Sequence, residues 1–199
     1  MINPNFVIAG AFLNLIGGLG YLIETLKGKV KPNRVTWLLW AIAPFVAFSG
    51  QLSQGVGILA LMTFMAGFTP LIIFAASFVN KKAYWKLGWF DFTCGILAVI
   101  GLAGWYATKS GNVAILFGIL ADGLAALPTL VKAYRAPETE DFRIYALGAI
   151  SATITLLAIP TWKFAYYAFP LYILCMTLAL TATILVCKKK LIFNTNKMN

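Results

Sequence analysis

The stretch that decides the fold is GILADGLAALPTLVKAYRAPETEDF, residues 118–142. Its first half is apolar enough to lie in a lipid bilayer, yet it carries one carboxylate, Asp122, and one proline, Pro128. An acidic side chain at the centre of a bilayer costs about 2.5–3.5 kcal/mol on insertion scales. Something around Asp122 must offset that cost, and the rest of the chain indicates what it is.

The whole chain has the composition of an integral membrane protein. Of its 199 residues, 61% are hydrophobic and only 11% are charged, whereas ordinary soluble domains carry about 25% charged residues. There is no histidine, which removes the commonest proton shuttle and metal ligand. The three cysteines are widely spaced and odd in number, which favours neither a disulfide framework nor a metal site. We therefore expect no metal and no cofactor.

Seven segments are apolar and long enough to approach the length of about 20 residues that a spanning helix needs. They are residues 6–26, 35–52, 55–79, 84–106, 112–133, 142–160 and 164–187. The connections between them are short and leave no room for a soluble domain. The predicted fold class is all-α, an integral membrane protein with seven transmembrane helices.

The basic residues predict how these helices are oriented. Fourteen of the 16 lysines and arginines follow the first, third, fifth and seventh segments, and only Lys109 and Lys163 lie on the other side. The positive-inside rule then places the N-terminus outside and the C-terminus in the cytoplasm. The net charge of +10 is thus explained by membrane topology and by attraction to anionic lipid rather than to nucleic acid. We expect a multi-pass protein of a prokaryotic plasma membrane.

A shift of about 108 residues aligns two parts of the chain without a gap. It places Gly10 on Gly118, Leu39 on Leu147, and Lys81-Lys82 on Lys189-Lys190. The shift maps the first three helices onto the last three and leaves the fourth as a connector, so both repeats insert in the same orientation. We predict a first three-helix repeat at 1–82, a linker helix at 83–108, a second repeat at 109–190 and a cytoplasmic tail at 191–199.

The same shift pairs Asp122 with Asn14, so each repeat carries one polar side chain at the same depth of its first helix. Substrate sites of repeat transporters lie near the bilayer midplane, between the repeats. Helical spacing puts Gly118, Asp122, Ala125 and Thr129 on one narrow face, and Leu116, Leu120, Leu124 and Leu127 on another. We interpret Asp122 as a carboxylate that binds a cationic group or exchanges a proton. The alternative, for Asp122 and Asn14 alike, is a hydrogen bond that only links helices.

Further candidates surround this pair. Trp40, on one face of its helix with Trp37 and Pro44, can stack on a solute or hold a cation, with plain packing as the alternative. Pro128 and Pro44 interrupt helix hydrogen bonding and are candidate hinges. The predicted substrate-binding or proton-coupling residues are Asp122, Asn14, Trp40 and Thr129, with no catalytic and no metal-binding residue.

The 3+1+3 arrangement, the external N-terminus and the stretch LPTLVKAYRAPETEDF, residues 127–142, resemble the PQ-loop superfamily. That group includes the SWEET sugar carriers, lysosomal amino-acid exporters related to cystinosin, and the KDEL receptors. Pro128 is followed here by Thr129 instead of the glutamine of the naming dipeptide. SWEET carriers use an asparagine in the third helix of each repeat, and the third and seventh segments here have none. The resemblance implies alternating access between two triple-helix bundles. The missing asparagines count against a sugar as the substrate.

The predicted function is transport of a small polar solute, cationic or zwitterionic, with proton coupling left open, as is assembly into a homo-oligomer. The alternative is a ligand-binding receptor or sorting protein on the same fold. An enzyme is not expected. An intramembrane aspartyl protease would need Asp91 and Asp122 at one site, and the predicted depths of these two residues differ by several residues. We interpret Asp91, about two turns inside the fourth helix, as structural. An ion pair between Glu24 and Lys132 at the cytoplasmic side stays open, and the acids of APETEDF are predicted to start a helix.

Overall fold

The computed structural model describes residues 2–80, 85–108 and 110–198, and these parts of the chain form helices and no strands. The α-helices are α1 Phe6–Leu26, α2 Arg34–Ser53, α3 Leu61–Ala76, α4 Trp89–Thr108, α5 Gly111–Arg135, α6 Phe142–Ala158 and α7 Phe164–Met198. Two short 3₁₀ helices, η1 Gly57–Ala60 and η2 Pro137–Thr139, precede α3 and α6. Five spans, namely α1, α2, η1 with α3, α5 and most of α7, are long and apolar enough to cross a membrane. The chain is therefore built as a multi-pass membrane protein.

Within the described residues the structure has seven α-helices, as predicted, with three main differences at their ends. The third helix, predicted at 55–79, is divided into η1 Gly57–Ala60 and α3 Leu61–Ala76. The fourth helix begins at Trp89, so Asp91 lies in its first turn and not two turns inside it. The seventh continues to Met198, past Lys188–Lys190, because a run of lysines ends an apolar span without ending a helix. Lys81, Lys82 and Lys109, which the charge balance and the repeat used, lie outside the described residues.

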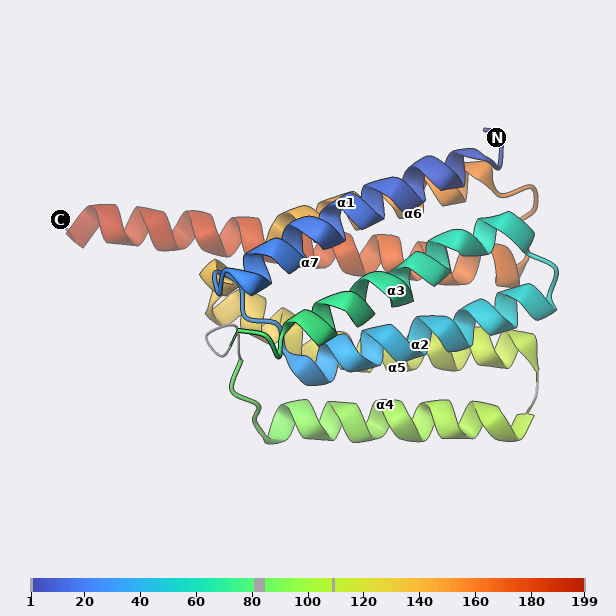
Figure 1. Ribbon diagram of the computed structural model, residues 1–199, viewed down its shortest axis with the longest axis horizontal. Coiled ribbons are helices and arrows are strands. Elements are labelled where there is room, and N and C mark those ends of the chain that lie inside the picture. The colour runs from blue at the N-terminus through green and yellow to red at the C-terminus, as the bar shows by residue number, and fades with distance from the viewer. Residues whose placement is uncertain (1, 81–84, 109, 199) are drawn as a thin grey trace.

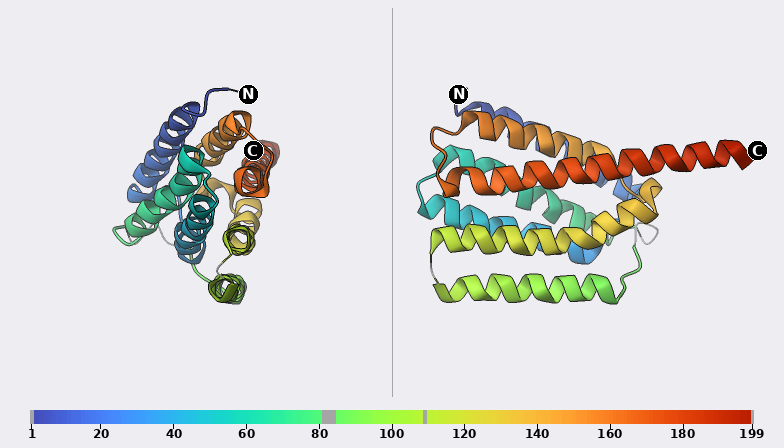
Figure 2. Two further views of the ribbon diagram at one scale, coloured as in Figure 1. Left: turned by 90° about the vertical axis from the view of Figure 1, so that its right-hand side faces the viewer. Right: turned by 180° about the vertical axis from the view of Figure 1, so that it is seen from behind.

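The helices lie side by side, and successive helices run in opposite directions, with the two chain termini at opposite ends of the bundle (Figure 1). In the first half of the chain α3 packs against both α1 and α2, and in the second half α7 packs against both α5 and α6. Between the halves α1 packs on α6 and α2 packs on α5. Six helices thus form a closed ring in the order α1, α3, α2, α5, α7, α6. Helix α4 packs outside the ring, against α5 and α2 (Figure 2).

Small residues allow α2 and α5 to approach closely. A Cβ atom on Gly118 would lie 2.9 Å from the Cβ of Ala47 and 3.1 Å from the carbonyl oxygen of Ala43. This is the close backbone approach that small residues permit between membrane helices. The opposite face of α5 carries Leu116 and Leu120, which are 44% and 50% exposed. The narrow polar face of α5 is therefore buried against α2, and the leucine face points outward, as the sequence predicts.

Two apolar clusters occupy the two ends of the ring. One includes Val7, Met62, Ile115, Ile159 and Phe169, at the end where α1, α3, α5 and α7 begin. The other includes Tyr21, Trp37, Ile73, Ala133 and Ile184, toward the opposite end. The candidate site lies where the two clusters meet, and its wall includes Trp37 and Trp40 of the second cluster.

Candidate functional site

A cavity of about 80 Å³ lies inside the ring of six helices. Every helix of the ring contributes to its wall, including Asn14 of α1, Trp40 of α2, Thr69 of α3, Asp122 of α5, Tyr145 of α6 and Thr177 of α7. Most of the wall is apolar, and its polar groups are few. The structure thus brings three of the four predicted binding residues, Asp122, Asn14 and Trp40, to one cavity. The fourth, Thr129, is buried in α5 but does not line it.

Asp122 is held in place from two sides. The hydroxyl of Tyr172, on α7, donates a hydrogen bond of 2.7 Å to its Oδ2 atom. The indole N–H of Trp40, on α2, donates to its backbone oxygen at 3.2 Å. The residue is only 3% exposed, and within the described residues no lysine or arginine forms an ion pair with its carboxyl group. Asp122 is therefore a buried acid whose side chain has a hydroxyl partner but no counterion.

Asn14 is positioned by one side-chain contact. Thr69 of α3 donates a hydrogen bond of 2.7 Å to the Oδ1 atom of Asn14. An asparagine amide has two further donors on its nitrogen, and Asn14 is itself part of the cavity wall. This arrangement fixes the amide oxygen and leaves the amide nitrogen as a donor for a bound molecule.

Aromatic rings form one side of the cavity. Trp37 and Trp40 meet edge to face with ring centroids 5.4 Å apart, and Trp40 meets Tyr145 in the same way at 6.3 Å. Tyr21 packs behind them, with its ring centroid 4.7 Å from that of Trp37. Trp37 is 1% exposed, so it belongs to the core and not to an interfacial belt. These rings are a surface that attracts cations as well as apolar groups.

The prolines lie where the sequence placed them. Pro44 and Pro128 are buried inside α2 and α5, and α5 changes direction in its last third (Figure 2). A third proline, Pro70 in α3, lines the cavity directly. Each of them removes one helical hydrogen bond, and so does Pro170 in α7. Four of the six ring helices are therefore interrupted at one point within the described residues.

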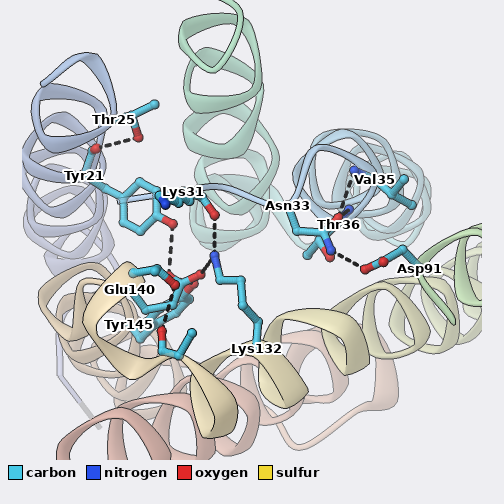
Figure 3. A network of polar contacts seen from close by, with 12 residues as sticks. Tyr21, Thr25, Lys31, Asn33, Val35, Thr36, Asp91, Lys132, Glu140 and Tyr145 are labelled. Carbon is cyan, nitrogen blue, oxygen red and sulfur yellow. Dashed lines mark hydrogen bonds and ion pairs between the residues drawn. The ribbon is translucent and has the colours of Figure 1, made fainter. Parts of the chain in front are cut away.

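A second polar cluster lies next to the cavity, around Glu140 in the connection between η2 and α6 (Figure 3). The Glu140 carboxylate forms an ion pair with Lys132 of α5, and both side chains are fully buried. Its Oε2 atom accepts hydrogen bonds from the hydroxyls of Tyr21, at 2.9 Å, and Tyr145, at 3.0 Å. We call Tyr21, Lys132, Glu140 and Tyr145 the Glu140 network. Because Tyr145 also lines the cavity, the network is in direct contact with the candidate site.

The Glu140 network joins the two parts of the chain. Lys132 also donates a hydrogen bond to the backbone oxygen of Lys31, in the connection between α1 and α2. The backbone N–H of Lys31 donates to the carbonyl of Thr139 at 3.1 Å. On α7, Lys188 donates to the backbone oxygen of Glu140 at 2.7 Å. The basic connections after α1 and α5 therefore meet the basic end of α7 at one end of the bundle.

Comparison with protein-family models, with curated proteins and with solved structures finds no match. Only the geometry of the site and the arrangement of the helices bear on function.

The sequence did not reveal the role of Glu140. APETEDF was predicted to start a helix, and it does: Asp141 is the N-cap of α6 and accepts a hydrogen bond from the backbone N–H of Arg143 at 3.0 Å. Burial raises the pKa of Asp141, but hydrogen bonds from Arg143 outweigh it and hold that pKa below its usual range. Glu140, one residue earlier, turns inward instead. The available signal was Lys132, a cation near the end of an apolar segment, which needs a buried acid as partner.

The open question of a Glu24–Lys132 pair is answered in the negative. Glu24 forms ion pairs with Lys27 at 3.3 Å and Lys29 at 3.4 Å, while the acid beside Lys132 is Glu140. Both lysine partners of Glu24 are more than half exposed, so its pairs contribute little to stability.

Asp91 has the structural role that the sequence favoured. Its Oδ1 atom accepts a hydrogen bond from Asn33 Nδ2, and its Oδ2 atom accepts one of 2.6 Å from the backbone N–H of Gly88. The side-chain oxygen of Asn33 in turn caps α2. Asp91 thus ties the start of α4 to the start of α2 (Figure 3). Asp91 and Asp122 have different partners on different helices, and they do not form a pair of carboxylates.

Proposed function

We propose that this protein is a small-solute membrane transporter that works by alternating access between two triple-helix bundles. The bundles are residues 1–82 and 109–190, and residues 83–108 form the linker. The packing pattern supports this division: α3 lies between α1 and α2 as α7 lies between α5 and α6. The 108-residue shift maps α1 onto α5 and α2 onto α6. It therefore relates the contact between α1 and α6 to the contact between α5 and α2, and both contacts are present. The same arrangement underlies the resemblance to the PQ-loop superfamily.

One observation carries the proposal. Asn14 and Asp122 are equivalent under the shift, come from different bundles, and line one cavity between them. A site that both bundles build is exposed to one side or the other when the bundles rock against each other. Polar groups inside a membrane protein are costly, and their usual justification is a substrate or ion pathway.

Asp122 supplies the chemistry of transport in this proposal. Its carboxyl group has no counterion among the described residues, so it is neutralised either by a proton or by the cationic group of a solute. Since both neutralise the same carboxyl group, binding of one displaces the other. The expected result is exchange of solute for protons.

The Glu140 network is proposed as the closed gate on the cytoplasmic side. The positive-inside rule assigns that side to the end of the bundle that holds the basic connections, with the N-terminus outside. Opening there requires separating Tyr21 from Glu140 and Lys132 from the backbone of Lys31, which are contacts between the two bundles. Pro128 and Pro44 are the proposed hinges, and the membrane is the plasma membrane of a prokaryote.

The test uses the purified full chain in proteoliposomes that contain a pH-sensitive dye. Amines, amino acids, sugars and vitamins are added one by one, and both solute accumulation and proton flux are measured. We expect one class of solute to drive proton movement in the wild type and to fail in Asp122→Asn. The matched control is Thr181→Val on α7, because Thr181 does not line the cavity and its hydroxyl donates to the backbone oxygen of Thr177 at 2.8 Å. A solute that binds tightly and is never accumulated would contradict transport and favour the receptor.

A further inference from the structure

We infer that the cavity selects a small organic cation that also carries a neutral hydrogen-bond acceptor, the chemistry of an amino alcohol, over zwitterions and sugars. This inference depends on the proposed role of the cavity as the solute site, and it narrows the substrate class of that site. It is drawn from three features of the wall: the missing counterion of Asp122, the kind of charge that the wall lacks, and the free donor of Asn14.

The first feature favours a cationic solute. The Asp122 carboxyl group accepts one hydrogen bond, from Tyr172, and forms no ion pair within the described residues. A buried carboxylate without a counterion is strongly disfavoured. An ammonium group placed in the cavity beside Asp122 supplies that counterion, and the aromatic rings of Trp40 and Tyr145 surround its carbon substituents with a surface that attracts cations.

The second feature excludes a carboxylate on the solute. Where the structure describes the chain, no lysine or arginine lines the cavity. Lys132, the buried cation of the adjacent Glu140 network, is already paired with Glu140 and hydrogen-bonded to the backbone of Lys31. A zwitterion would bring its negative group into a wall with no positive partner, which has a large desolvation cost. A monocation avoids that cost.

The third feature calls for a neutral acceptor. The Oδ1 atom of Asn14 is engaged by Thr69, so the amide nitrogen remains as a donor on the cavity wall. A hydroxyl or carbonyl oxygen of the solute satisfies it. A volume of about 80 Å³ admits roughly five to eight water-sized groups, which suits a small molecule with one ammonium and one hydroxyl group. A sugar of that size would place several hydroxyls against a mostly apolar wall.

The test compares three probes of similar size on the purified full chain by titration calorimetry. Choline carries a quaternary ammonium group and a hydroxyl group. Glycine betaine has a carboxylate in place of the hydroxymethyl group of choline. Tetramethylammonium has the cation but no hydrogen-bond acceptor. We expect choline to bind at least about tenfold more tightly than glycine betaine, because the carboxylate has no partner. We expect choline to bind about fivefold more tightly than tetramethylammonium, the net contribution of one hydrogen bond.

Two variants and one control assign these differences to residues. Asn14→Leu should weaken choline binding about fivefold and leave tetramethylammonium unchanged, because only choline uses the amide donor. Asp122→Asn should weaken both cations by more than about tenfold. Thr181→Val should change neither, since Thr181 does not line the cavity and its hydroxyl donates to a backbone oxygen of its own helix α7. If Asp122→Asn does not fold, Asn14→Leu decides the inference by itself.

The inference is overturned if glycine betaine binds as tightly as choline, if none of the three probes binds, or if Asn14→Leu weakens both cations equally. Transport is judged separately, from accumulation in proteoliposomes. Glycine betaine that binds and accumulates would overturn the amino alcohol class and leave the transporter in place. Choline that binds as expected but never accumulates would overturn the transporter and leave the amino alcohol class in place.

Discussion

Replacing Glu140 with glutamine should destabilise the protein more than any other single amide-for-acid change in the described chain. Glu140 and Lys132 are both fully buried and paired, and the same carboxylate accepts hydrogen bonds from Tyr21 and Tyr145. Glutamine keeps the shape of the side chain but removes its charge. Lys132 is then a buried cation whose remaining contacts within the described residues are uncharged: the backbone oxygen of Lys31 and the ring of Trp85, whose centroid lies 5.4 Å from Nζ. Breaking one side of a buried ion pair costs about 3–5 kcal/mol.

That cost is large enough to measure in detergent. For a chain of this size 1 kcal/mol corresponds to a shift of about 2–4 °C in Tm, so Glu140→Gln should lower Tm by roughly 6–20 °C. The assay is thermal unfolding followed by tryptophan fluorescence. The matched control is Glu138→Gln, two residues away and exposed, which should shift the free energy of unfolding by no more than about 0.5 kcal/mol.

A double variant separates the ion pair from other effects of the substitution. Adding Lys132→Met to Glu140→Gln removes the stranded cation, so the double variant should be more stable than Glu140→Gln alone. Equal melting of Glu140→Gln and Glu138→Gln would refute the claim that the Glu140 network holds the two bundles together. The claim would also be refuted if the loss of stability in the double variant equalled the sum of the losses measured for Glu140→Gln and Lys132→Met separately.

Three further predictions concern the cavity and the helix contacts. Tyr172→Phe removes the hydroxyl that bonds Asp122, so solute-driven proton flux in proteoliposomes should change its pH profile while the protein still binds solute; an unaltered profile would contradict a role for Tyr172. Asn33→Ala removes the α2 cap and the partner of Asp91 and should lower stability by about 1–2 kcal/mol in a thermal melt, whereas a neutral effect would contradict the docking of α4. Gly118→Val should separate α2 from α5, because a Cβ atom at position 118 would already lie 2.9 Å from the Cβ of Ala47. The folded yield in size-exclusion chromatography should fall in this variant and should not fall in the control, Leu116→Val on the outer face.

Much of the fold follows from apolar length alone. The first helix was predicted at 6–26 and is Phe6–Leu26, and the fifth was predicted at 112–133 and is Gly111–Arg135. The bilayer imposes this regularity, because every backbone polar group in it must be paired within its own helix. The ends of helices are less well predicted where a charged run ends the apolar span but does not end the helix. This is the case at Lys188–Lys190, beyond which α7 continues.

Helical spacing and the internal repeat predicted part of the candidate site. The shift that pairs Asn14 with Asp122 identifies two residues of one cavity, and the face shared with Gly118 and Ala125 is buried as expected. Tyr172 and Glu140 were not identified. Tyr172 sits in an apolar run where a tyrosine is unremarkable, and the inward turn of Glu140 depends on packing between elements far apart in sequence. Such contacts leave no periodic signal.

The central claim is that one cavity, built by both halves of the chain, is reached in turn from each side of the membrane. Thr177 lines that cavity, so a Thr177→Cys variant lacking Cys94, Cys175 and Cys187 can report access to it. Membrane-impermeant maleimide is applied from either side of oriented proteoliposomes, and the rate of labelling is measured from each. The account predicts labelling from both sides, with faster labelling from the cytoplasmic side when Tyr21→Phe weakens the Glu140 network. Labelling from one side only, unchanged by Tyr21→Phe, would contradict it.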